Sequence, residues 1–362
     1  MENRNNADEI QTMIQDFKTK LNNAFKDTKY SNETDQIISA YKKYLIYGMK
    51  IGFLNSNNIH LFNINSVTFD PKTNSYAMIS TSQSINDLSI SERFFEELKN
   101  NNRHRDNVIY HELSHIIFST LCREKLSNLR LYILYLEQQK GWKYTLDFNS
   151  NFVKACNGFT KLFDEVLTQE TSERFSEGIE GYQRKEKSKF KSKIYTPDID
   201  CESNFQTYED YQELFLSFAR TLNGFGNLND AEIYDKFKDM LEKGTIANHI
   251  IGTYQEKHLE SELTNIFLIM EKVVEAHIAA MGINVVYTGD KEALTNEVNE
   301  LLAFLRQNKN VDKFKEYTVE DYPPPPRITA TKKFSDIAEA KRRLNRDTQG
   351  LQPNNRNEVN GE

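Results

Sequence analysis

The segment Val108–Ile117 has the sequence VIYHELSHII, in which Glu112 is the only charged residue. It contains an HExxH pattern, with His111 and His115 four positions apart. Residues i and i+4 of an α-helix lie one turn apart on the same face, so imidazoles with this spacing can bind one metal ion. Apolar residues on both sides of the pattern and the absence of proline favour a buried helix. The segment therefore predicts a helix over 106–122 that carries a metal site.

The glutamate of this pattern is predicted to be a catalytic base. Glu112 follows His111 directly and points about 100° away from it around the helix axis. Its carboxylate can reach a metal-bound water without becoming a ligand, which is the arrangement of zinc-dependent hydrolases. Two alternatives remain: a metal site without turnover, and two core histidines without a metal. The second would leave a charged glutamate in an apolar helix in need of another partner.

A catalytic zinc site needs a third protein ligand and an open fourth position. The extended pattern HExxHxxGxxH does not apply, because Phe118 and Leu121 occupy its glycine and histidine positions. Glu124 is nine residues beyond His115, which is about 13 Å along a straight helix and too far to share the ion. The third ligand is therefore expected elsewhere in the chain.

Glu165 is the predicted third ligand. It stands among Leu, Phe and Val residues in a predicted helix over 160–177, where an unpaired carboxylate would be costly. Glu170 and Glu173 are the reserve candidates. The other interpretation is that Asp164, Glu165 and Glu170 line the solvent side of an amphipathic helix.

HELSH together with DEVLTQ at 164–169 resembles the gluzincin metallopeptidases, which carry HExxH on one helix and a glutamate ligand on a second helix downstream. In thermolysin-like members the second motif is NExxSD, and its positions are occupied here by Asp164, Glu165, Thr168 and Gln169. In those relatives the last acidic group holds the first histidine, so Gln169 is a departure, although an amide can accept a weaker hydrogen bond. The resemblance covers about 105–180 and implies a zincin-like active-site fold that hydrolyses peptide bonds.

The rest of the chain predicts a mainly α fold with a small antiparallel β element, of the α+β class. Two strands, Ile59–Phe69 and Tyr76–Thr81, are expected to form a hairpin around the turn at 70–74. By analogy with zincins, an edge strand of this hairpin would hold extended substrate. The predicted parts are N-terminal helices and the hairpin (1–104), a zincin-like catalytic core (105–222), a C-terminal helical subdomain (223–320), and a proline-rich linker with a disordered tail (321–362).

Composition limits the other functional classes. The net charge of the 362 residues is −7, so bulk attraction to nucleic acid or to an anionic membrane is not indicated. The mean hydropathy of −0.68 and the absence of an apolar run of about 20 residues predict no transmembrane helix. Three scattered cysteines and a polar N-terminus without an apolar core are typical of a cytoplasmic protein. The oligomeric state is left open.

The sequence thus predicts a zinc-dependent metalloendopeptidase acting on a peptide or protein, with Zn²⁺ on His111, His115 and Glu165. The alternative is a binding or regulatory protein that keeps the zincin fold without turnover. A third interpretation is a helical scaffold whose proline run, Pro323–Pro326, recruits a partner. The residue that stabilises the oxyanion is left unassigned among Tyr182, Tyr195, His249 and His258. The basic run 184–193 is interpreted as a solvated loop, or else as a flap that contacts substrate.

Overall fold

The computed structural model of the protein describes residues 2–73, 75–82, 85–139, 151–181, 205–280 and 289–317. The described residues all belong to one compact unit. The predicted tail at 321–362 and the basic run 184–193 lie outside the described residues. The division of 1–320 into three parts stays a prediction.

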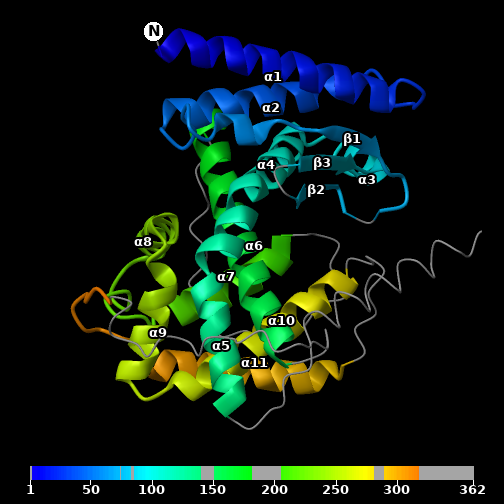
Figure 1. Cartoon of the computed structure of the whole chain (residues 1–362). Helices are drawn as coiled ribbons and strands as arrows, with labels where there is room; N and C mark the ends of the chain where they lie inside the picture. The colour runs from blue at the N-terminus through cyan, green and yellow to red at the C-terminus, as the bar shows by residue number, and fades with distance from the viewer. Residues whose placement is uncertain are drawn as a thin grey trace, which may run out of the picture. The chain divides into compact units, whose positions relative to one another are not determined.

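The described residues form a mainly helical fold with one small sheet, so the α+β class is confirmed (Figure 1). The N-terminal part contains α1 (Glu2–Phe25), α2 (Thr34–Lys50), the 3₁₀ helix η1 (Ile59–Phe62), β1 (Ser66–Phe69), β2 (Ala77–Ser82), β3 (Ile85–Ile90) and α3 (Glu92–Glu96). It is followed by α4 (Asn102–Lys125), α5 (Ser127–Gln139), α6 (Asn151–Glu180) and α7 (Phe205–Ala219). The remaining helices are α8 (Asp230–Lys243), α9 (Ile246–Glu256), α10 (Glu260–Ala280) and α11 (Lys291–Gln307).

The sheet differs from the predicted hairpin. Its strand order is β1-β3-β2, in which β2 is antiparallel to β3 but β1 is parallel to β3. The predicted strand Ile59–Phe69 was wrong over its first half, because Ile59 and Phe62 are both fully buried on one 3₁₀ turn. Strand β3 was missed because Asn86 interrupts the apolar alternation. The Asn86 amide is nevertheless buried and donates to the carbonyls of Leu61 and Asn63.

The helix that carries the HExxH pattern begins earlier than predicted. The side chain of Asn101 caps it by accepting a hydrogen bond from the His104 backbone N–H. Asp106, where the predicted helix began, lies inside the helix, where it is buried and pairs with Lys43 of α2 at 2.6 Å. The helix therefore has one more turn ahead of His111 than the sequence pattern indicated.

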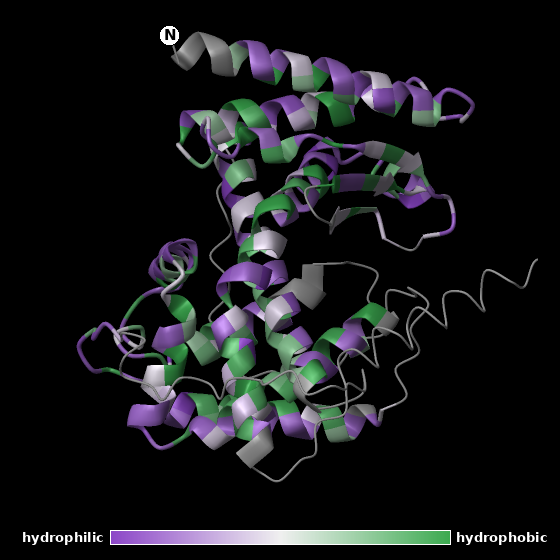
Figure 2. Ribbon diagram, in the orientation of Figure 1, coloured by the Kyte–Doolittle hydropathy of each residue, from purple (hydrophilic) through white to green (hydrophobic). Residues whose placement is uncertain are grey.

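Helices α4 and α6 pack along each other and form the centre of the fold, with α2 against both of them and β2 against α4. Figure 2 shows hydrophobic residues along α4, α6 and α10, whereas hydrophilic residues dominate α1. The rings of Tyr44 and Phe175 stack with centroids 4.3 Å apart, and the Tyr44 hydroxyl lies 3.0 Å from the Ser114 hydroxyl. This packing fixes the rotation of α4 about its axis, so the histidine face turns toward α6.

Glycine at position 158 allows α10 to lie close to α6. A Cβ atom there would be 2.4 Å from the carbonyl oxygen of Phe267, which is shorter than any real contact. Within the described residues, the helices fall short of the combined length and apolarity that crossing a membrane requires.

Candidate metal centre

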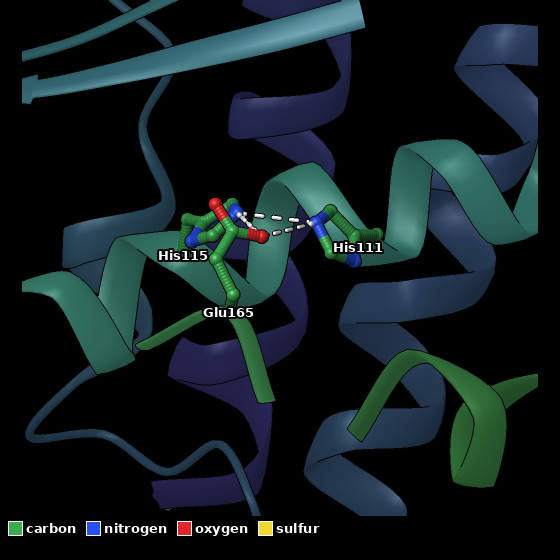
Figure 3. Close-up of side chains that lie close together, drawn as sticks. All are labelled: His111, His115 and Glu165. Atoms are coloured by element: carbon green, nitrogen blue, oxygen red, sulfur yellow. Dashed lines mark hydrogen bonds and ion pairs between the residues drawn. The ribbon is translucent and has the colours of Figure 1, made fainter. Parts of the chain in front are cut away.

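Three predicted ligands converge at the interface of α4 and α6. His111 and His115 point from successive turns of α4, and Glu165 reaches toward them from α6 (Figure 3). The Nε2 atoms of the two histidines are 3.2 Å apart. Glu165 Oε2 lies 3.4 Å from His111 Nε2 and 3.6 Å from His115 Nε2. Donors on a tetrahedral ion with bonds near 2.0–2.1 Å are separated by about 3.3–3.4 Å. The three atoms therefore have the spacing of three corners of such a tetrahedron.

The other ring nitrogen of each histidine has an oxygen partner from α6. His111 Nδ1 lies 3.0 Å from Gln169 Oε1, and His115 Nδ1 lies 3.0 Å from Asp164 Oδ1. Since both partner atoms are acceptors, both Nδ1 atoms donate to them, and both Nε2 atoms are left to direct a lone pair toward the same point when a metal ion is bound. Glu165 Oε2 faces this point and is buried without a hydrogen-bond partner. Positive charge between the two Nε2 atoms and this oxygen, from a metal ion or from a proton on His115, offsets the cost of placing them together.

Electrostatics of the surrounding carboxylates also favour a cation. The Glu112 carboxylate is buried and accepts a hydrogen bond from the Ile79 backbone N–H of β2 at 2.7 Å. Burial raises its pKa and outweighs the opposing attraction of the two histidines. Burial alone would lower the pKa of His115, but Asp164 and Glu165 raise it to about 10. Burial would likewise raise the pKa of Glu165, but the histidines lower it overall.

Only one group of three His, Cys, Asp or Glu side chains within the described ranges has the spacing to hold a metal ion, and it is this one. The reserve candidates lie elsewhere on α6. Glu170 is buried and accepts from Arg174 at 2.8 Å, and Glu173 accepts from Gln169 Nε2 at 2.9 Å. Both carboxylates are therefore engaged outside the position where the three donors meet.

A cavity of about 390 Å³ opens beside this group. It is lined by residues 75–79 at the start of β2, by the two histidines with Glu112 and Glu165, and by Ile278 of α10. His104 and Asn107 also line it and were missed from the sequence. A signal was present, because these residues precede His111 by seven and four positions and so lie on the same face of α4.

Of the four candidates for the oxyanion role, the two histidines lie away from this cavity. Tyr182 and Tyr195 lie outside the described residues. His258 is exposed in the turn between α9 and α10, and it does not line the cavity. His249 is buried against Phe314, and its Nε2 donates to the Asn223 carbonyl at 2.9 Å. Neither histidine is placed to contact a substrate bound at the metal centre.

His249 predicts an acid-sensitive fold instead. Burial lowers its pKa from 6.5 to about 4, so the folded protein favours the neutral ring. A lowered histidine pKa gives stability that is complete above pH 6.5 and is lost as the pH falls toward 4. The difference between these two pKa values corresponds to about 3 kcal/mol in the free energy of unfolding. In urea titrations between pH 7 and 4, we expect His249 to account for a loss of this size, while His277, whose pKa burial lowers likewise, adds its own. His249→Gln should show a smaller loss, and His258→Gln should behave as wild type. Equal slopes for wild type and His249→Gln would contradict the assignment.

Comparison with protein-family models, with curated proteins and with solved structures finds no match to this chain. Its functional class therefore has to be inferred from the geometry of the site.

Proposed function

We propose that the protein is a zinc-dependent peptidase of the gluzincin type, with zinc on His111, His115 and Glu165 and with Glu112 as the general base. One observation carries the proposal: two imidazole lone pairs and a buried, unpartnered carboxylate oxygen meet at tetrahedral spacing. A divalent cation at this point would bind all three atoms at once.

The donor set favours zinc over the harder divalent ions. Two imidazoles and one carboxylate are typical ligands of catalytic zinc, whereas magnesium and calcium prefer oxygen ligands only. Three protein ligands leave a fourth position, and the cavity gives access to it. When bound, zinc polarises a carbonyl group and acidifies water.

Glu112 is suited to move the proton in this reaction. Burial raises the pKa of Glu112 and so moves it toward the operating pH, where a general base is most effective. The Ile79 N–H holds one carboxylate oxygen, so the side chain is oriented before the substrate binds. In the proposed mechanism Glu112 takes a proton from the attacking water and delivers it to the leaving amine.

Strand β2 offers a binding edge for an extended peptide. It forms one edge of the sheet, and its residues line the cavity beside the metal centre. Because the Ile79 N–H faces Glu112 and not β3, the backbone of Ala77, two residues earlier, also faces the outer edge. A substrate strand that pairs with Ala77 would extend past the metal centre, which is recognition by strand addition.

Hydrolysis of an unfolded protein tests the proposal. We expect purified protein to cleave reduced, carboxymethylated lactalbumin, to stop when the metal is removed by 1,10-phenanthroline, and to recover with stoichiometric zinc. Protein that binds zinc tightly but leaves this substrate and a mixed peptide library uncut would favour the binding or regulatory alternative. Cleavage that persists after complete metal removal would rule out the metal centre as its source.

A further inference from the structure

Gln169 is the position where the chain departs from the thermolysin-like pattern, and its contacts explain why. The side chain is buried, with 3% of its surface exposed. Its Oε1 accepts from His111 Nδ1 at 3.0 Å, and its Nε2 donates to Glu173 Oε1 at 2.9 Å. Residues 165, 169 and 173 are spaced by four and form one stripe of α6. The amide therefore connects a predicted ligand to a carboxylate one turn further along the helix.

The amide makes both contacts, whereas an ionised carboxylate could make only one of them. The protonated Nδ1 of His111 requires an acceptor, and the Glu173 carboxylate requires a donor. An Asp or Glu at position 169 would present acceptors to both partners, and two carboxylates would then face each other. The opposite orientation of the Gln169 amide would set its oxygen against Glu173 and its NH₂ group against the His111 N–H. The orientation in the structure gives both Oε1 and Nε2 a complementary partner.

We propose that Gln169 is a positioning residue that transmits the negative charge of Glu173 to His111. This inference rests on the proposed metal centre. Each histidine is then supported by one carboxylate: His115 by Asp164 directly, and His111 by Glu173 through one polarised amide. The acidic group that holds the first histidine has moved one turn along α6 and acts through Gln169.

The arrangement predicts unequal support for the two ligands. An outer partner of a metal-bound histidine typically changes metal affinity 10- to 100-fold. Asp164 contacts His115 directly and also accepts from the Ser119 hydroxyl at 2.5 Å. Removing Asp164 should therefore lower metal affinity by close to 100-fold. Glu173 acts through a neutral group, so we expect its charge to contribute about 10-fold.

The test is Glu173→Gln, which keeps an acceptor for Gln169 Nε2 and removes only the charge. We expect zinc affinity, measured by competition with a chromophoric chelator, to fall about 10-fold. In ¹⁵N-edited NMR of the zinc-free protein, the His111 Nδ1–H proton should move upfield, because its acceptor is less polarised. Glu177→Gln, which removes a charge one turn further along α6, is the matched control and should change neither measurement.

The possible results separate the relay from the metal centre. Unchanged zinc affinity together with an unchanged Nδ1–H signal in Glu173→Gln would overturn the relay and leave the metal centre standing. An equal loss of zinc affinity in Glu173→Gln and Glu177→Gln would also overturn the relay. The general effect of removing one negative charge near the site would then explain the loss. Wild-type protein that binds no zinc would refute the proposed function, whereas the zinc-free NMR measurement would still decide whether Gln169 connects the two groups.

Discussion

Glu112→Gln is expected to lower the turnover of peptide substrates by at least 10²- to 10⁴-fold while zinc occupancy stays at the wild-type level. The substitution keeps the shape of the side chain and its acceptor for the Ile79 N–H at 2.7 Å, so the position of β2 is preserved. It removes only the basicity. Since the proton is moved in the transition state, KM should change little and kcat should carry the loss. Steady-state kinetics with metal analysis of the same samples measure both quantities.

The stability of this variant is a useful control. Glu112 is buried, and burial disfavours its charged form. An amide in its place avoids that desolvation cost, so the melting temperature should not fall. A variant that loses both zinc and stability would make Glu112 a structural partner of the histidines. Full zinc with undiminished cleavage would place the activity outside this motif.

Local geometry explains how much of the candidate metal site could be predicted from the sequence. The relation between His111, Glu112 and His115 depends only on helix periodicity, so the pattern and its apolar flanks were sufficient. Glu165 required a different argument, the cost of a carboxylate among apolar residues, because nothing local relates α6 to α4. Helix packing decides that Glu165 and Gln169 face α4, while Glu170 turns to Arg174.

The sheet shows why other parts could not be predicted. Antiparallel hairpins follow from turn chemistry between neighbouring segments, and this led to the expectation of two strands around 70–74. The structure instead inserts β3 between them, and the parallel β1–β3 pair depends on contacts between residues about 20 positions apart. Burial of Asn86 in β3 removes the apolar alternation that would have indicated a strand. Packing of β2 against α4 brings Ile79 to Glu112, a contact that periodicity cannot predict.

Glu165→Gln is expected to weaken zinc binding by at least about 100-fold, more than the loss of an outer partner of a ligand typically costs. Two imidazoles without the carboxylate form an incomplete site, because catalytic zinc needs three protein ligands. The amide keeps the size of the side chain, so the packing of α6 on α4 should persist. Zinc should also no longer raise the melting temperature, since only a ligand that binds the folded state stabilises it. Competition with a chelator and thermal unfolding with and without zinc provide the two measurements.

Glu170→Gln is the control on the same helix; its carboxylate is more buried than that of Glu165 but lies outside the group of three. The substitution removes the carboxylate that pairs with Arg174, so a modest loss of stability is expected. The Arg174 guanidinium keeps its contact with Asp235 of α8. Its zinc affinity should equal that of wild type, because its carboxylate is held by Arg174 and is not among the three donors that meet. If Glu170→Gln lost zinc and Glu165→Gln kept it, the third ligand would have to come from Glu170. Helix α6 would then be rotated about its axis in solution, and the contacts of Asp164 and Gln169 with the two histidines would be broken as well.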